Sequence, residues 1–323
     1  MIQLWTLCFF AVWAVISNTE KMDAPPAAMP PAMRSAYTMN NKISVSHFYV
    51  DDTLMGKGTH FKYSSEIISS YVNSYRQKLS RWRTFAEKEN LDNDTASLND
   101  IVMSLDKMHW PLIALDAVFK QNGLHGKKVV VFGTQDPWAE AICLALGSSN
   151  ITTVEYNNLT LENPALRTLK PAEFRRLVLE DGERYDVALS FSSFDHDGLG
   201  RYGDPLSPDG DIEAVRLMHT SLAATGIAFL TLPIGQDLIV WNLHRRYGAL
   251  RLPLILDGWT ILKRIGWNES QIYADNDFRR SYEPVLLLQP ISPEFNTQQS
   301  KRNGMCPSTT VTPEKKSEHA GTS

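Results

Sequence analysis

Short apolar runs that alternate with helical segments are the feature that most constrains what this 323-residue chain can fold into. The runs are 127–133, 151–157, 185–194 and 226–233, each rich in β-branched or apolar residues. Strands that alternate with helices form βαβ crossovers, which place the strands in a mostly parallel sheet. The sequence therefore predicts a doubly wound α/β fold, with the later segments 259–267 and 283–290 supplying two edge strands.

Helix start and stop signals lie between these runs. Asp136 and Pro137 predict an N-cap and first helical residue for a helix that closes at Gly147. A second helix is expected at 171–178, and a third at 212–222 with Asp211 as its candidate N-cap. Each helix fills the gap between two strands, as a parallel sheet requires.

The chain before residue 126 is predicted to fold differently. Apolar positions at helical spacing indicate a helix over 66–88, and a further helix is expected over 100–121. We therefore expect a helical N-terminal extension over 37–125, a Rossmann-like domain over 126–290, and a disordered tail over the polar segment 291–323. Residues 18–36 are rich in Ala, Pro and Met and predict an extended linker that forms neither helix nor ladder.

The N-terminus predicts the compartment. Residues 4–16 form an uncharged apolar run, too short to span a membrane comfortably and typical of a signal peptide over 1–17. An uncleaved signal anchor and a buried N-terminal helix are the alternatives. The four glycosylation sequons, at Asn93, Asn150, Asn158 and Asn268, fit a secreted or lumenal glycoprotein.

The net charge and the cysteine content limit which kinds of ligand and partner this chain is expected to bind. The net charge is −4, from 32 basic and 36 acidic side chains, which is not the basic excess of a nucleic-acid-binding protein. The 43% of hydrophobic residues suffice for a sizeable core and argue against wholesale disorder. Cysteine spacing predicts no metal site. Cys143 is expected on a buried helix, and a Cys143–Cys306 disulfide stays open for an oxidising compartment.

Two residues near the first strands fit a nucleotide-type ligand. Gly133 follows the first strand, at the turn where doubly wound folds bind cofactors, although a glycine there can also simply permit a tight turn. Glu155 ends the second strand, 22 residues later, which is the spacing of the acid that binds ribose hydroxyls. An ordinary surface acid is the alternative for Glu155.

The densest polar cluster follows the third strand, in the segment SSFDHDGLGRYGDPLSPDGD over 192–211. It contains Asp195, His196, Asp197, Arg201, Tyr202, Asp204, Asp209 and Asp211. Loops at the carboxyl end of a central strand commonly carry ligand-binding groups, although turns and helix capping account for part of this composition. We expect His196, Arg201 and Tyr202 to point into one cleft shared with the Gly133 turn.

The order VVVFG, VEYN, YDVALSFSSFDHDGLGRYGDPLSPDGD and LAATGIAFLTLPIG over about 100–290 resembles a domain-of-unknown-function family first described from nematode proteins, with bacterial relatives. That family is similar to class I S-adenosylmethionine-dependent methyltransferases. The resemblance implies a Rossmann-like fold and S-adenosylmethionine as cofactor, with Gly133, Glu155 and Phe194 in cofactor binding. The sequence departs from that pattern because the usual glycine triplet is reduced to Gly133.

Three functions remain open from the sequence. The first is a methyltransferase acting on a small-molecule or glycan acceptor, with Arg201, Tyr202 and Asp204 binding substrate. Its catalytic base is His196, or a carboxylate of Asp195 or Asp197. The second is a metal-dependent, glycosyltransferase-like enzyme that uses Asp195 and Asp197. The third is a non-catalytic binding protein on the same fold. None of the three involves nucleic acid, and a membrane enters only through an uncleaved N-terminal anchor.

Overall fold

The computed structural model describes residues 24–88, 110–275, 277–279 and 281–291. The predicted signal segment, Asn93, Cys306 and nearly all of the predicted tail lie outside these residues. Within the described part of the chain, no helix is long and apolar enough to cross a membrane.

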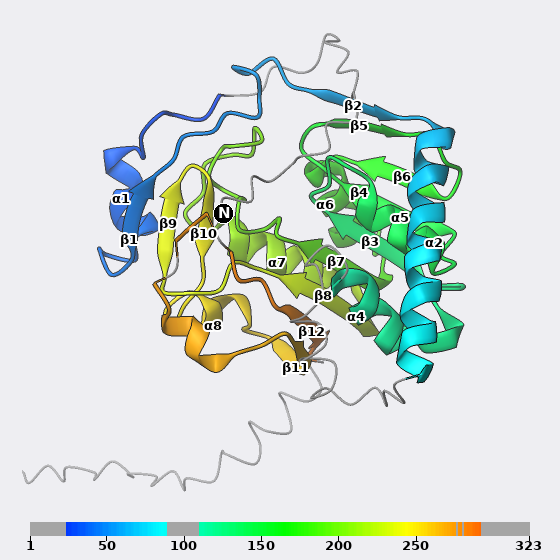
Figure 1. Ribbon diagram of the computed structural model, residues 1–323. Coiled ribbons are helices and arrows are strands. Elements are labelled where there is room, and N and C mark those ends of the chain that lie inside the picture. The colour runs from blue at the N-terminus through cyan, green and yellow to red at the C-terminus, as the bar shows by residue number, and fades with distance from the viewer. Residues whose placement is uncertain (1–23, 89–109, 276, 280, 292–323) are drawn as a thin grey trace, which may run out of the picture. The chain divides into compact units, whose positions relative to one another are not determined.

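A seven-stranded sheet forms the centre of the fold, in the order β11-β12-β8-β7-β3-β4-β6 (Figure 1). The strands are β3 (Lys128–Phe132), β4 (Asn150–Val154), β6 (Leu166–Leu169), β7 (Tyr185–Phe191), β8 (Leu222–Thr231), β11 (Trp259–Ile265) and β12 (Val285–Pro290). Neighbours from β6 to β8 pair in parallel, whereas β12 pairs antiparallel with both β8 and β11. The prediction of a doubly wound, mostly parallel α/β fold is confirmed, and the two later segments form β11 and β12 at one edge of the sheet.

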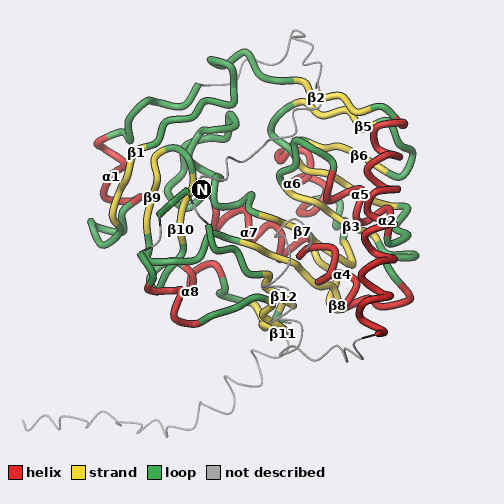
Figure 2. The backbone as a smooth tube through the Cα atoms, viewed as in Figure 1, coloured by secondary structure: helices red, strands yellow, loops and turns green. Residues whose placement is uncertain are grey.

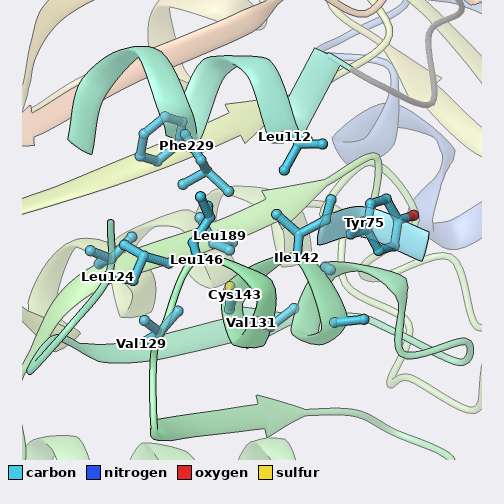
Figure 3. Packing of buried hydrophobic residues seen from close by; sticks show 14 of the residues in the cluster. Tyr75, Leu112, Leu124, Val129, Val131, Ile142, Cys143, Leu146, Leu189 and Phe229 are labelled. Carbon is cyan, nitrogen blue, oxygen red and sulfur yellow. The ribbon is translucent and has the colours of Figure 1, made fainter. Parts of the chain in front are cut away.

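Helices cover both faces of this sheet because the side chains of each strand alternate between two apolar clusters. Val129 and Val131 of β3 join the cluster that contains α2 (Ser65–Lys88), α4 (Trp110–Phe119) and α5 (Trp138–Ala145). Figure 3 shows this packing, with Cys143 of α5 buried among aliphatic side chains. Val130 joins the cluster of α6 (Pro171–Leu179), α7 (Gly210–Ser221) and α8 (Leu252–Ile255) on the opposite face. Cys143 is a free, fully buried thiol, as predicted for a helix in the core.

The segment that precedes β3 adds strands as well as helices. β1 (Ser44–His47) pairs in parallel with β9 (Leu238–Trp241), which pairs with β10 (His244–Arg246). β2 (His60–Tyr63) pairs in parallel with β5 (Asn158–Leu161). In Figure 1 the chain between β1 and β2 therefore links two small sheets, and Figure 2 shows that this link is mostly loop. These pairings are long-range, so local periodicity did not reveal them.

The predicted absence of a helix in 18–36 is wrong at its end, because α1 spans Pro31–Tyr37. Pro31 occupies the first helical position, where a missing N–H costs nothing and the fixed φ already suits a helix. Tyr37 then fixes the helix to the body of the protein. Its ring is fully buried, and its hydroxyl donates to the Gly198 carbonyl at 2.5 Å.

Two predicted helix caps are also wrong. α5 begins at Trp138, one residue later than expected, and the Asp136 carboxylate accepts a hydrogen bond from the Tyr71 hydroxyl of α2 at 3.2 Å instead. α7 begins at Gly210, so Asp211 lies inside its first turn. Short 3-10 turns, η2 (Lys120–Asn122) and η3 (Glu269–Tyr273), complete the assignment. The carboxylates of Asp136 and Asp211 thus accept hydrogen bonds from side chains distant in the sequence and do not cap the helix next to them.

Candidate active site

A pocket of about 820 Å³ opens at the carboxyl ends of the central strands. From β3 the chain proceeds to β4 and β6 on one side, and then returns to β7 and β8 on the other. The connections that leave β3 and β7 therefore run to opposite sides of the sheet, and such a switch point leaves a crevice in which open α/β sheets bind ligands. The pocket is lined by residues that follow β3, β4, β6 and β7, together with side chains of α6 and α7.

Gly133 lies at the turn after β3 and lines this pocket. Its φ is 66°, and a Cβ placed on it would lie 1.7 Å from the Ser193 Oγ and 2.7 Å from the Ser193 Cβ. The glycine is required because the turns after β3 and β7 approach each other here. Of the two sequence-based interpretations, the close packing of these turns accounts for the residue, and its cofactor contact stays a prediction.

Glu155 follows β4 and also lines the pocket, although only 6% of the residue is exposed. Its Oε1 accepts hydrogen bonds from the Asn157 backbone N–H at 2.8 Å and the Asn157 Nδ2 at 3.3 Å. Burial raises the pKa of the carboxyl group to about 7, against the lowering effect of Asn157 and the Lys170 ammonium. Glu155 is thus held in place by its own turn at the predicted ribose position.

Phe194 forms part of the apolar wall. Its ring centroid lies 5.2 Å from that of Phe132, and both residues line the pocket. Phe132 in turn packs edge-on against Phe174 of α6, also at 5.2 Å. The sequence placed Phe194 after the third strand, and the structure brings it beside the end of β3.

His196 lines the pocket, but its ring nitrogens are engaged elsewhere. The Nδ1 lies 2.5 Å from the Leu243 carbonyl oxygen, which only accepts, so Nδ1 carries the proton and donates it. The Nε2 lies 3.5 Å from the Oδ2 of Asp195, which is 1% exposed and does not line the pocket. Burial lowers the pKa of His196 to about 4 and raises that of Asp195 to about 7, so a neutral imidazole faces a carboxyl group that readily keeps its proton.

The positions of His196 and Asp195 do not match the catalytic roles predicted for them from the sequence. Asp195 lies beneath the pocket surface, so its predicted contact with substrate is not supported by its position. The side chain of His196 is 13% exposed, which makes it a largely buried histidine. The structure therefore brings His196 to the pocket wall with its second nitrogen directed at Asp195.

Asp197 and Tyr156 are two further polar residues that line the pocket. Burial and the neighbouring Asp204 raise the pKa of Asp197 well above its usual range. Burial also raises the pKa of Tyr156, with Asp197 the largest of the nearby charges that act on it. Sequence reasoning missed Tyr156, although it directly follows Glu155, because a residue next to a strand end gives no signal of the side to which it points.

Of the three residues predicted to bind substrate, only Tyr202 lines the pocket. Tyr202 lines the pocket, with its ring edge-on to His196 at 5.4 Å. Arg201 does not line it, because its Nε donates to the Asp52 Oδ2 at 2.6 Å and its guanidinium lies over the Tyr202 ring. The expected convergence of His196, Arg201 and Tyr202 is therefore wrong for Arg201.

Asp204 and Asp211 hold the loop in place. Asp204 accepts hydrogen bonds from the backbone N–H groups of Gly198, Gly200 and Tyr202 at 2.7, 2.8 and 3.1 Å. It does not line the pocket, so its predicted contact with substrate is replaced by a structural role. Asp211, the predicted helix cap, is fully buried and instead accepts from Arg251 and Tyr247. The position of Asp211 just before an apolar helical run favoured a capping role. Its carboxylate is buried, however, and a buried charge must be paired, so it binds Arg251.

Asp195 and Asp197 are not arranged as the metal ligands that a glycosyltransferase-like enzyme would need. Asp195 lies under the pocket and Asp197 in its wall, so the two carboxylates do not line one cavity. No group of three or more His, Cys, Asp or Glu residues that could hold a metal ion occurs in the described ranges. Two basic residues that the sequence did not single out, Lys170 and Arg175, line the α6 side of the pocket.

The sheet order, with antiparallel β12 inserted next to edge strand β11, defines a methyltransferase-like α/β fold of class I type. Residues 126–278 match the family described as Caenorhabditis protein of unknown function, so the resemblance stated from the sequence is confirmed. No curated protein matches the sequence.

Two solved structures illustrate the likeness of the fold. A 1,6-didemethyltoxoflavin-N1-methyltransferase of Burkholderia thailandensis, with bound 1,6-didemethyltoxoflavin and S-adenosylhomocysteine, is 14% identical, with 66% of this chain and 90% of that chain covered and a TM-score of 0.39. A ribosomal protein L11 methylase of Lactobacillus delbrueckii subsp. bulgaricus is 8% identical, with 57% and 77% covered and a TM-score of 0.34.

Proposed function

We propose that the protein is an S-adenosylmethionine-dependent methyltransferase that acts on a small-molecule or glycan acceptor in the secretory pathway. One observation carries this proposal. The pocket lies at the switch point of the sheet, and the buried Glu155 carboxyl lines it at the end of the second strand. That is where an acid binds the ribose hydroxyls of an adenosine cofactor in this type of fold.

The residues around Glu155 fit an adenosine-containing group. Phe132 and Phe194 supply apolar surface, and Gly133 lets the turn after β3 approach the ligand. The backbones of three more glycines, Gly198, Gly203 and Gly210, line the pocket from the opposite loop. When bound, S-adenosylmethionine supplies an electrophilic methyl group on a sulfonium centre.

The protein's own part is to align the acceptor, exclude water and accept a proton. Among the acid–base groups weighed for the loop, Asp197 lines the pocket and has no hydrogen-bond or ion-pair partner for its carboxylate within the described part of the chain. Burial and the neighbouring Asp204 raise its pKa, which makes the ionised carboxylate a stronger base for an acceptor proton. His196 stabilises the loop and shapes the wall, since its Nε2 faces Asp195.

The placement in the secretory pathway rests on the uncharged apolar run over 4–16 and on the sequons. Asn150 and Asn268 are exposed, as glycan acceptors must be. Asn158 differs from them because it is partly buried and lines the pocket. We therefore assign glycans to the exposed pair.

A non-catalytic binding protein on the same fold is the second candidate. One observation favours it: the histidine that the sequence placed at the reacting centre is largely buried and bonded to Leu243. Such a protein would bind a cofactor-like ligand in the same pocket without transferring a group.

Calorimetry of the purified protein with S-adenosylhomocysteine tests the proposal. We expect binding that Glu155→Ala weakens about tenfold or more, because a charge-assisted hydrogen bond contributes about 1.5–3 kcal/mol. Glu180→Ala, at an exposed position on the end of α6, is the matched control and should bind as the parent does. Absence of binding, or equal binding by both variants, contradicts the assignment, and methyl transfer to an acceptor separates the enzyme from the binding protein.

A further inference from the structure

The charges that line the pocket are divided between its two sides. Lys170 and Arg175 lie on the α6 side, whereas the loop after β7 and the helix α7 supply Asp197 and Glu213. The Lys170 ammonium already donates to the Tyr156 carbonyl oxygen. The charged residues that line the pocket from the β7 loop and α7 are therefore both acidic.

Tyr156 lines the same pocket, and the carboxylates of Asp197 and Glu213 are close enough to act on its hydroxyl. The charges that act on it are, in order, Asp197, Asp204, Glu155 and Glu213, all carboxylates. Asp197 is acted on by the carboxylates of Asp204, Asp211 and Glu155, and by the Arg245 guanidinium with the opposite sign. Arg245 is fully buried behind the loop, where its guanidinium donates to the carbonyl oxygens of Asp197 and Ser207.

Three groups of this side have no partner of their own. In the part of the chain that the structure describes, the Tyr156 hydroxyl and the carboxylates of Asp197 and Glu213 make no hydrogen bond or ion pair. Carboxylates that share a partly desolvated space repel one another, and an opposite charge within reach relieves that repulsion. The three groups come from the loop after β4, the loop after β7 and α7, so no single local motif explains why all of them line one pocket.

The chemistry of the pocket selects among ligands. A cationic nitrogen would pair with both carboxylates and donate to the tyrosine hydroxyl, with charge-assisted hydrogen bonds that are stronger than neutral ones. Aromatic rings of Trp138 and Tyr202 also line the pocket, and such faces attract cations. An anionic acceptor would instead be repelled from this side.

We propose that the acceptor is a small molecule with a positively charged amine, and that Tyr156, Asp197 and Glu213 form the subsite that binds it. This assignment rests on the proposed methyltransferase function, because it places the acceptor in the same pocket as the cofactor. Asp197 and Glu213 bind the charge, and Tyr156 accepts or donates beside it. The acidic side thus determines which acceptors enter.

Calorimetry with three probes of one shape and different charge tests the subsite: benzylamine, benzyl alcohol and benzoate. Each is titrated into the full-length protein with and without S-adenosylhomocysteine. We expect benzylamine to bind about tenfold more tightly than either other probe, and Asp197→Asn to weaken it by about tenfold, since asparagine keeps the shape and removes the charge. Asp257→Asn, at an exposed position outside the pocket, should leave it unchanged.

The outcomes separate the two proposals. Failure of S-adenosylhomocysteine to bind contradicts the methyltransferase function, whatever the probes do. Equal binding of the three probes, no binding of benzylamine at millimolar concentration, or unchanged affinity in Asp197→Asn overturns the amine subsite, whatever the cofactor does. If Asp197→Asn does not fold, Glu213→Gln on the exposed face of α7 replaces it, with the same expected loss and the same contradicting result.

Discussion

Replacing Asp211 by asparagine should strongly destabilise the fold, because this carboxylate neutralises two buried guanidinium groups. Asp211 is fully buried, and its oxygens accept from the Arg251 Nε at 2.8 Å, the Arg251 Nη2 at 2.5 Å and the Tyr247 hydroxyl at 2.9 Å. The Arg245 Nε lies 3.7 Å away and has no hydrogen-bond partner of its own within the described residues. The neighbouring arginines hold the pKa of Asp211 below its usual value, so the carboxylate is ionised at neutral pH.

The magnitude follows from what the substitution leaves behind. The asparagine side chain would turn an amide N–H₂ toward arginine donors and would deprive the buried Arg245 and Arg251 of the buried carboxylate that lies beside both. Breaking a buried pair in this way costs about 3–5 kcal/mol. At about 2–4 °C per kcal/mol for a domain of this size, the melting temperature should fall by about 6–20 °C.

Urea unfolding followed by far-UV circular dichroism measures the free energy of unfolding. Asp209→Asn is the matched control, because Asp209 lies 3.5 Å from the same Arg251 but its side chain is 64% exposed. An exposed pair contributes about 0–1 kcal/mol, so this control should change little. Equal losses in the two variants, or a loss below about 1 kcal/mol in Asp211→Asn, would refute the argument that burial makes the pair indispensable.

Three further outcomes are expected. In urea unfolding, Gly133→Ala should lower the free energy of unfolding by about 1–3 kcal/mol more than Gly182→Ala. Both glycines have a positive φ, but only at Gly133 would a Cβ meet Ser193. Equal losses would contradict the close packing of the two turns. Burial raises the pKa of Glu140 to about 7, so the folded state binds a proton that the unfolded state releases, and the free energy of unfolding should fall as pH rises from about 5 to about 8. Glu155 and Asp195 have similarly raised pKa values and remain in Glu140→Gln, so this variant should reduce the slope of the profile without abolishing it. An unchanged slope would contradict a contribution from Glu140. Expression in a secretory eukaryotic cell should give a glycosidase-sensitive mass that decreases in Asn268→Gln, whereas an unglycosylated cytosolic chain that retains Met1 would contradict the predicted compartment.

The elements that the sequence predicted well are those whose signal is local. The apolar runs at 127–133 and 185–194 became the adjacent central strands β3 and β7, and the helical spacing over 66–88 became α2. Strand–helix alternation then determined the parallel sheet, because a βαβ unit has only one favoured way to pack. For the site, the same alternation placed Gly133, Glu155 and Phe194 at one edge of the sheet, where all three line the pocket.

Side-chain direction and long-range partners were decided only by the tertiary structure. Arg201 and Asp204 stand in the polar loop beside Tyr202, yet Asp52 and the loop backbone bind them, and Tyr202 alone of the three reaches the pocket. Asp211 has the spacing of a helix cap but pairs with Arg251, 40 residues away. A sequence pattern reports neighbours along the chain, whereas a buried charge takes whichever partner the fold brings within hydrogen-bond distance, because leaving it unpaired costs more than any local turn or cap can return.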